Sequence, residues 1–541
     1  MPLRRFRRFL LLLLTAGLML PVLALLGVWL PWRARDGQAV QILAEMARTV
    51  LPDYALTSLW LCLLVAAGVV VVGLSSAVAV TVFDFAGRRV FEWALLLPLA
   101  MPAYVVAYAY TDFLQYSGPL QTWLRSATGL QGRLFPEIRN VAGAAWVLTF
   151  ALYPYVYLLA RTALGERAAH LMEAARLLGA PLSRRIREVA LPLARPAVAA
   201  GAALALMETL ADFGVASYFG IQTFTAGIYK AWLAMDNRVA AAQLATLLLG
   251  LVAVLLWLEH RSRQRLRFVS ARLGRQAGAE AQPVRLRGTG LALAWAICGL
   301  PLLMGFVAPV LFMLRPLLAD WSALPWDRFL VWAGNSLRLG VLSAVLALGF
   351  ALLLAYSLRR MPDMLTRAVV RLASLGYAVP GAVVVVGLLL PVGWVQAAWP
   401  HSAAAYWVTA TSLGLLWAYL VRFCAVALQS VQSGYARIPL SLDDSARMLG
   451  SSGWGLLRRV HWPLLRRSTM AAALLVFVDV MKELPATLVL RPFNSDTLAV
   501  VAYQLARDER LGEAALPSVA LVLVGLIPVL LLSRTLRTRS E

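Results

Sequence analysis

Five charged residues stand inside long apolar segments, where their types and spacing could serve cation chemistry. Glu208 and Asp212 lie four positions apart, and so do Asp479 and Glu483, with Lys482 beside the second pair. Residues four apart share one face of a helix. Charges at membrane depth are costly and usually face a cavity or a partner, and carboxylate oxygens suit a hard cation. The acids are predicted to line or gate a transport pathway, with bracing of neighbouring helices as the alternative.

The two acidic pairs can be aligned in two ways. An offset of 271 positions (479 − 208) places Asp479 opposite Glu208, whereas an offset of 274 places Lys482 there. The residues alone leave both alignments open, and in either one Lys482 can neutralise a neighbouring acid. The scattered histidines and cysteines show no metal-ligand or redox spacing, so no metal site, cofactor or catalytic residue is predicted.

A polar loop occurs twice along the chain, again 271 positions apart. The first copy contains Glu173-Ala174-Ala175, Gly179 and Leu191-Pro192, and the second contains Asp444-Ser445-Ala446, Gly450 and Trp462-Pro463. Each pattern predicts a helix that stops at a left-handed glycine. In the first copy, Ser183 is predicted to cap a second short helix that ends near Pro192. Small alanines permit close approach by a partner, and two copies with one spacing argue against a mere connection.

The loop spacing resembles the EAA loop of ABC importer permeases, E-A-A-x3-G-x9-I-x-L-P. The first copy departs by Val189, and the second by Asp444, Ser445, Val460 and Trp462. Five downstream strings resemble the fused ferric-iron permeases: Met207–Gly214, Gln222–Tyr229, Met481–Leu488, Arg491–Asn494 and Asp496–Ala499. This resemblance spans nearly the whole chain. It implies two coupling helices that seat in two ABC ATPase subunits, and a periplasmic binding protein that delivers ferric iron; thiamine or a phosphonate would be the alternative substrate.

Composition places the chain in a membrane. Hydrophobic residues make up 61% of it, and the mean hydropathy of +0.74 excludes an ordinary soluble domain. The net charge of +23 comes from arginines that lie between apolar segments, so lipid rather than nucleic acid is the expected contact. Twelve segments are long enough to cross a bilayer: 9–30, 55–83, 93–116, 141–160, 196–219, 239–258, 289–314, 335–356, 368–395, 405–427, 468–490 and 513–533. Pro98, Pro102 and Pro380 are expected to permit kinks.

The predicted fold is an all-α polytopic membrane protein with two parallel six-helix halves, the duplicated transmembrane domain of a type I ABC importer. The halves are residues 1–258, with an EAA loop at about 161–195, and 289–541, with an EAA loop at about 428–467; a basic cytoplasmic linker, 259–288, joins them. Arginine and lysine concentrate on alternate loops, which predicts cytoplasmic termini and cytoplasmic EAA loops in a bacterial inner membrane.

The chain is predicted to transport without hydrolysing ATP itself. A phosphate-binding loop needs a lysine after glycine in G-x-x-x-x-G-K-[ST], and neither Lys230 nor Lys482 has that context. A proton-coupled secondary transporter is the rival class, favoured by the string Asp84–Arg89. That class, like a membrane scaffold, leaves the duplicated loop unexplained.

Overall fold

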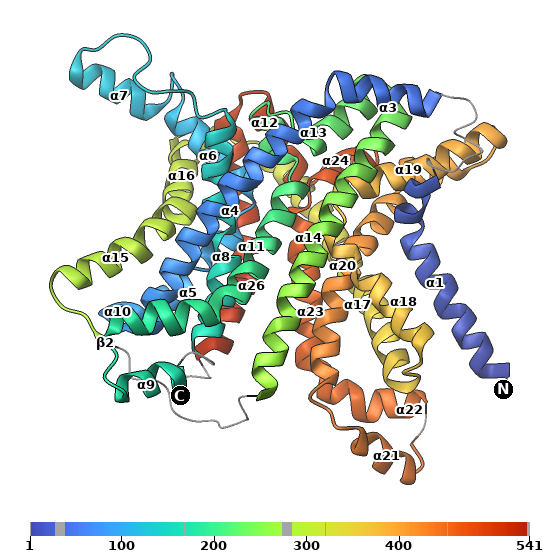
Figure 1. Cartoon of the computed structure of the whole chain (residues 1–541). Coiled ribbons are helices and arrows are strands. Elements are labelled where there is room, and N and C mark those ends of the chain that lie inside the picture. Colours follow the sequence, from blue (N-terminus) through green and yellow to red (C-terminus); the bar gives the residue numbers. More distant parts are fainter. Residues whose placement is uncertain are drawn as a thin grey trace. The chain divides into compact units, whose positions relative to one another are not determined.

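The structure is a computed structural model that describes residues 2–27, 38–165, 169–272, 284–319, 321–451 and 453–537. The described chain is helical nearly throughout (Figure 1), which confirms the predicted all-α class. Its one described sheet is minimal: β1 (Phe83–Asp84) pairs in parallel with β2 (Val284–Arg285). Residues 273–283 of the predicted linker, and the terminal residues 1 and 538–541, lie outside the described residues.

The helices form two compact units that interleave along the sequence. Unit 1 comprises Met1–Ala44, Ile228–Thr246 and Pro325–Val501, and unit 2 comprises Glu45–Gly227, Leu247–Leu324 and Ala502–Glu541. Each unit therefore takes most of its residues from one sequence half and adds helices from the other.

Three mutually packed helices form the centre of unit 1: α17 (Trp326–Arg360), α20 (Ser412–Tyr435) and α23 (Trp462–Lys482). The N-terminal helix α1 (Pro2–Leu26) packs against α18 (Met364–Ser374) and α19 (Gly381–Ala398). The contact with α19 is close because Gly387 has no side chain, and a Cβ there would collide with the Pro21 carbonyl. The remaining elements are η5 (Lys230–Ala234), η8 (Gly376–Ala378), η9 (Tyr406–Ala410), α21 (Leu440–Met448), α22 (Trp454–Leu456), η10 (Leu457–His461) and α24 (Pro485–Leu490). Unit 1 ends within α25 (Leu498–Arg507).

Unit 2 has the equivalent centre, made of α4 (Leu51–Val82), α8 (Val141–Ala163) and α11 (Leu191–Ala211). The first helices of the second half, α15 (Thr289–Leu302) and α16 (Ala308–Ala319), pack here against α4 and α6 (Ala103–Leu114) respectively, and the last helix, α26 (Leu511–Arg537), packs against α16. The other elements are α3 (Gln38–Arg48), α5 (Arg88–Ala94), η2 (Leu97–Ala100), α7 (Pro119–Thr128), α9 (Ala169–Leu177), α10 (Leu182–Arg184), η4 (Arg185–Ala190), α12 (Gly214–Tyr218), α13 (Phe224–Tyr229), η6 (Leu303–Val307), η7 (Trp321–Ala323) and α14 (Arg238–Arg272). Helices α3, α13 and α14 each begin in one unit and end in the other.

Nine described helices are long and apolar enough to cross a membrane, or ten if one bent pair counts as a span. The sequence prediction of twelve segments is thus higher than the number of continuous spans. Three segments account for the difference: the described apolar part of α1 is short, the segment 93–116 is broken, and α23 carries four charged residues.

The predicted proline kinks are confirmed at two equivalent positions. Pro102 separates η2 from α6, and the helices on either side of this break are bent by 90°. Pro380 stands 278 positions later, between η8 and α19. Both are in an extended conformation with ψ of 139° and 143°. A proline cannot donate to a helix and disfavours helical geometry in the residue before it, so each span divides there.

Candidate functional site: two equivalent loops and the helices they continue

The repeated loops fold to the same turn. Two residues after α9 ends, Gly179 has φ of +81°, and two residues after α21 ends, Gly450 has φ of +80°. Past each glycine the next amide reaches back into the helix: Ala180 N–H donates to the Ala175 carbonyl at 3.0 Å, and Ser451 N–H donates to the Ala446 carbonyl at 2.9 Å. This pairing satisfies carbonyls that a helix end would leave open. The left-handed glycine stop predicted from the sequence is confirmed in both copies.

The segment after the turn corrects the prediction for the first loop. The N-cap of α10 is Pro181, without a side-chain cap, so the role given to Ser183 was wrong. Nor does the second helix end near Pro192, because α10, η4 and α11 run on as one apolar helix, Leu182–Ala211. The proline is tolerated because it lies in the first turn of α11, directly after a π-helical turn that shifts the hydrogen-bond register. In the second loop, Pro463 follows η10 in the same way.

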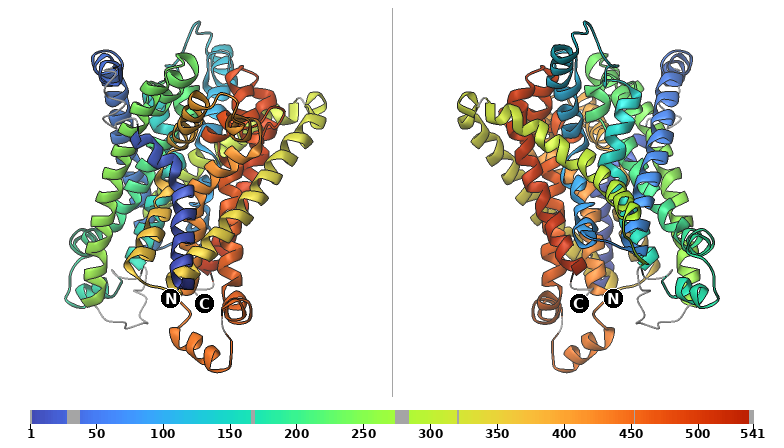
Figure 2. Two further views of the ribbon diagram at one scale, coloured as in Figure 1. Left: turned by 90° about the vertical axis from the view of Figure 1, so that its right-hand side faces the viewer. Right: turned by 90° about the vertical axis from the view of Figure 1, so that its left-hand side faces the viewer.

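Each turn presents two large apolar side chains to solvent. Leu177 and Leu178 are 83% and 88% exposed, and Met448 and Leu449, at the same places in the second copy, are 89% and 87% exposed. Figures 1 and 2 show α21 and α22 extending beyond the ends of α17, α20 and α23. An apolar pair on a protruding turn is suited to insertion into a groove of a partner protein.

The acidic residues that open the two motifs have equivalent neighbours. Glu173 pairs with Arg176 at 3.4 Å, and Asp444 pairs with Arg447 at 2.9 Å, both across one helical turn. All four side chains are at least 38% exposed, so each pair contributes little to stability and its groups remain accessible. The small residues follow on the same helices: Ala174 and Ser445 are exposed, and Ala175 and Ala446 are half-buried.

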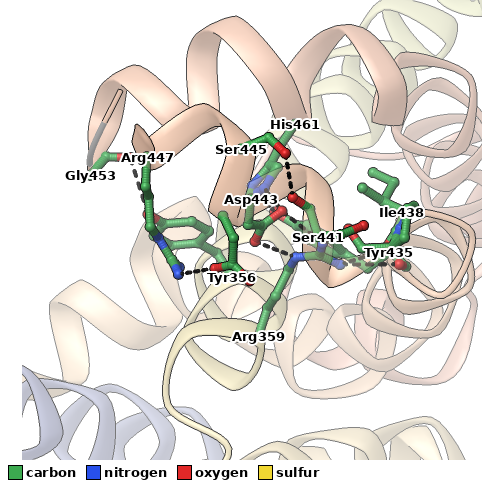
Figure 3. Close-up of polar contacts among 12 residues, drawn as sticks. Tyr356, Arg359, Tyr435, Ile438, Ser441, Asp443, Ser445, Arg447, Gly453 and His461 are labelled. Atoms are coloured by element: carbon green, nitrogen blue, oxygen red, sulfur yellow. Dashed lines mark hydrogen bonds and ion pairs between the residues drawn. The ribbon is translucent and has the colours of Figure 1, made fainter. Parts of the chain in front are cut away.

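A buried polar cluster, which we call the clamp, fixes the second loop to α17. It joins Arg359 of α17, Asp443 of α21, His461 of η10 and Tyr435 of α20 (Figure 3). The Arg359 guanidinium donates to both carboxylate oxygens of Asp443, at 2.8 and 2.7 Å. Its Nη1 donates to the backbone carbonyls of Tyr435 and Ile438 at 3.3 and 3.0 Å, and its Nη2 donates also to the Pro439 carbonyl at 3.1 Å. This two-pronged geometry matches a planar guanidinium to a carboxylate.

His461 completes the clamp from the side of η10. Its Nε2 lies 3.1 Å from Asp443 Oδ1, and its Nδ1 lies 3.3 Å from the Tyr435 hydroxyl. A proton on Nε2 satisfies both contacts, because Nε2–H donates to the carboxylate and Nδ1 accepts from the hydroxyl. Burial by itself would raise the pKa of Asp443, but the bonds from Arg359 and His461 outweigh it and hold that pKa below its ordinary value of 3.8. Asp443 is therefore a buried, paired anion at neutral pH.

The first loop has apolar residues where the clamp stands. At the same offset of 271, Met172 replaces Asp443 and Ala190 replaces His461. Both are buried, with 7% and 0% of their surface exposed. The first loop is thus seated by apolar packing and the second by an ionic network.

The predicted acids stand where α11 and α23 end. Asp212 and Glu483 are the C-cap residues of these helices, and each carboxylate accepts backbone amides of the next short helix. Asp212 accepts from Val215 and Ala216 at 3.0 and 3.2 Å. Glu483 accepts from Ala486 and Thr487 at 2.9 and 3.0 Å. Both acids therefore cap a helix N-terminus, where a negative charge is favourable.

Two hydroxyls on equivalent helices resolve the choice between the alignments. Ser58 accepts from the Phe224 amide at 3.3 Å, and Ser336 accepts from the Leu498 amide at 2.8 Å. The helices α11 and α23 end 271 positions apart, whereas these amides are 274 apart (498 − 224). Both offsets are correct, each in its own segment: Asp479 corresponds to Glu208, and three residues are added in the second half between the break and Leu498.

Reasoning from the sequence missed the cationic partners. Arg422 of α20 pairs with Glu483 at 2.9 Å, and Arg359 pairs with Asp443. These partners are 61 and 84 positions apart in the chain, so no local spacing connects them. His461, whose sequence spacing indicated no metal site, is wholly buried in the clamp. Asp479 and Glu208 are half-buried, as is Lys482. Within the described ranges, no group of three or more His, Cys, Asp or Glu residues is arranged to hold a metal ion.

Helices long and apolar enough to cross a membrane, a twofold repeat and a duplicated loop are together typical of a duplicated membrane transport subunit. The family model of the binding-protein-dependent transport system inner membrane component matches residues 69–268 and again 347–539, and the chain belongs to this family. The two matches begin 278 and end 271 positions apart, the same two offsets that the repeat shows. The chain is thus a permease of the ABC importer class, a multi-pass component of the inner membrane.

Two relatives match this chain along most of its length, and a third matches a shorter part of it. The Fe(3+)-transport system permease protein FbpB 2 of Haemophilus influenzae is 24% identical over 86% of this chain and 87% of its own. The probable ABC transporter permease protein y4fN of Sinorhizobium fredii is 25% identical over 96% of this chain and 94% of its own. The putative 2-aminoethylphosphonate transport system permease protein PhnV of Salmonella typhimurium is 28% identical, over 39% of this chain and 74% of its own.

Proposed function

We propose that this chain is the permease subunit of an ATP-driven importer of ferric iron, with both halves of the permease in one chain. A periplasmic binding protein would deliver the metal, and two copies of an ABC ATPase subunit would bind the two loops, one copy to each. The observation that carries this proposal is the pair of equivalent turns, each with a left-handed glycine and two exposed apolar residues. A single partner-binding surface would need one such turn, whereas a dimer of identical subunits needs two.

In this arrangement the termini and both loops lie in the cytoplasm. The support is the excess of arginine on alternate loops of the sequence. The loop residues that contact the ATPase subunits are Glu173, Ala174, Ala175, Gly179, Leu191 and Pro192 in the first copy, and Asp444, Ser445, Ala446, Gly450, Trp462 and Pro463 in the second.

The helices after the loops supply the mechanical link. From Leu182 to Ala211 the chain is one uninterrupted helix, and α22, η10 and α23 follow one another without a gap from Trp454 to Lys482. Each runs from a loop to a helix break capped by an acid, Asp212 or Glu483. When ATP draws the ATPase subunits together, movement of a loop would reach its acidic break through a rigid rod, since helical hydrogen bonds resist extension. Opening toward the binding protein would follow, and hydrolysis would reset the helices.

Ferric iron is favoured over a phosphonate for two reasons. The Fe(3+)-transport relative matches both halves of the chain, whereas the phosphonate-transport relative matches 39% of it. The candidate pathway groups Glu208, Asp212, Asp479 and Glu483 are carboxylates, which attract a hard cation and would repel a phosphonate. Lys482 is the one cation among the five candidates.

The test is iron uptake by cells that depend on this chain. Deletion should impair growth under iron limitation, and iron supplied through a different import route should restore it, whereas thiamine or 2-aminoethylphosphonate should not. Glu208→Gln should lower iron uptake per membrane-inserted molecule while binding of the ATPase is kept. The purified chain alone should neither hydrolyse ATP nor take up iron under a pH gradient. Uptake driven by the pH gradient alone would assign the chain to the secondary transporters instead.

A further inference from the structure

A cavity of about 740 Å³ lies beside the second loop, within unit 1. Half of its lining residues are in the last turns of α17, from Gly349 to Arg360. The others are Met361, Gly453, two residues of η10, Trp462 at the start of α23 and Leu11 of α1. Its volume falls in the range that buries a small organic ligand. The wall is largely apolar, and two of its large side chains, Leu353 and Trp462, are 40% and 49% exposed. The cavity lies at the end of α17, which is long and apolar enough to cross a membrane.

Two arginines make this cavity more than a gap between helices. Arg360, from α17, and Arg458, from η10, both line it and are both exposed. Neither forms an ion pair with a carboxylate in the described part of the chain. By contrast, Arg359, the residue before Arg360, uses its guanidinium nitrogens within the clamp. Guanidinium groups bind phosphate with paired hydrogen bonds, so the wall offers an anion site next to an apolar chamber.

We propose that this cavity binds one anionic phospholipid. An acyl chain would occupy the apolar part along Gly349 and Leu353, and the phosphate group would lie between Arg360 and Arg458. Trp462 has the amphipathic ring that is common at the level of lipid headgroups. A basic pocket between membrane helices is a known type of site for anionic headgroups. A zwitterionic lipid would bring the same phosphate but add a positive group, which two arginines disfavour.

The occupant would connect the membrane to the second loop. Arg360 is on α17 and Arg458 is on the helix that follows the turn at Gly450. The Tyr356 hydroxyl already joins α17 to the turn just before that helix, because it donates to the Gly453 carbonyl at 3.1 Å. The first loop retains an arginine, Arg187, at the position of Arg458, but Val82 stands where the 278 offset places Arg360. The lipid site is therefore a property of the second half.

The experiment measures lipid binding by the purified full-length chain, so its outcome does not depend on the substrate or on the ATPase. Delipidated protein is titrated with phosphatidylglycerol or phosphatidylcholine, and bound lipid is counted by native mass spectrometry. Phosphatidylglycerol should bind at one tight site. The variant Arg360→Gln/Arg458→Gln should bind it roughly ten-fold or more weakly, because a charge-assisted hydrogen bond accounts for about that factor. The control Arg187→Gln/Arg459→Gln removes the same charge outside the cavity and should bind as the wild type does.

A second variant tests the apolar part without changing charge. Gly349 has open space where its side chain would stand, so Gly349→Leu should fill the chamber and displace the acyl chain. Gly334, also open and also in α17 but outside the cavity wall, gives the matched control Gly334→Leu. The proposal is overturned if both lipids bind alike, if either cavity variant keeps the affinity of its control, or if inorganic phosphate without lipid occupies the site and blocks phosphatidylglycerol equally well in Gly349→Leu and in the wild type.

Discussion

Asp212 and Glu483 occupy the same position of the repeat and cap equivalent helices, yet in the described part of the chain only Glu483 forms an ion pair. The Glu483 carboxylate accepts a hydrogen bond from Arg422 at 2.9 Å, and its side chain is 1% exposed. Among the described residues no cationic side chain forms an ion pair with Asp212, and Ala151 stands where the offset places Arg422. One acid is thus neutralised within the fold, while the other keeps an uncompensated carboxyl group. Of the two, Asp212 is the stronger candidate for the proposed pathway.

This difference predicts opposite consequences of neutralising the two acids. Glu483→Gln strands the buried Arg422 guanidinium, and breaking a buried pair from one side costs about 3–5 kcal/mol. Asp212→Asn strands no cation and loses only part of a helix cap, about 0.5–2 kcal/mol. Membrane levels and thermal unfolding in detergent should therefore fall much further for Glu483→Gln. Asp212→Asn should lower iron uptake per molecule instead. Equal loss of stability in the two variants would remove the distinction between a structural and a pathway acid.

The two turn glycines should be required for their backbone conformation alone. No atom lies within 4 Å of a Cβ built on Gly179 or Gly450, so a larger residue meets no clash there. Valine at positive φ is nevertheless strained by about 1–3 kcal/mol. Gly179→Val and Gly450→Val should reduce transport while membrane levels stay normal, with Gly179 at least as sensitive. Asparagine, which tolerates this conformation, should restore much of the activity.

A matched control for the second turn is Gly455→Val. Gly455 also has open space around its Cβ, and its φ is not positive. Transport assayed in vesicles with the ATPase bound should be near normal in this variant. If Gly450→Val behaved as Gly455→Val does, the turn conformation would have no role in coupling.

The exposed apolar pairs should bind the ATPase without contributing to the fold. Leu178→Gln and Leu449→Gln remove side chains that are 88% and 87% exposed, so the free energy of unfolding should change by less than about 0.5 kcal/mol. Co-purification of the ATPase should nevertheless weaken, and most in the double variant. Met364→Gln on α18, which is 88% exposed, is the control. Undiminished ATPase binding by the double variant would place the interface elsewhere.

The clamp should stabilise the second loop in a pH-dependent way. Because folding lowers the pKa of Asp443, its contribution is fully present above the ordinary carboxyl value of 3.8 and is lost as the pH falls through the lowered pKa. Asp443→Asn removes this component at every pH and leaves Arg359 without its anion. The variant should unfold at a lower temperature than the wild type at neutral pH, and the gap should close as the pH falls well below 3.8.

A double variant separates the ionic clamp from packing in general. Arg359→Met/Asp443→Leu leaves no buried charge, so it should recover much of the stability that Asp443→Asn loses. Thermal unfolding in detergent provides the comparison, with Asp444→Asn as a control because its carboxylate is 70% exposed. A double variant no more stable than Asp443→Asn would mean that Asp443 acts through something other than its charge.

Local patterns in the sequence determined much of this protein. Apolar segments indicated the helical membrane fold, and the offset of 271 between the two loops revealed the repeat. The glycine that ends each loop helix was predictable as well, because a left-handed stop depends on a few consecutive residues. Pro102 and Pro380 likewise divide their helices through their own covalent geometry. Each of these features is governed by interactions between residues close together in the chain.

The tertiary structure decided what depends on distant partners. Nothing near Asp443 indicates that Arg359, 84 positions earlier, will hold it, and nothing near Glu483 indicates Arg422. The sequence likewise does not indicate that the first helix of each half packs in the unit formed mostly by the other half, because α1 is apolar enough to pack on either half. Whether each acid is neutralised also depends on the fold. Arg422 pairs with Glu483, whereas Ala151 occupies the equivalent position in the half that contains Asp212. Helix packing, rather than spacing along the chain, brings these groups together.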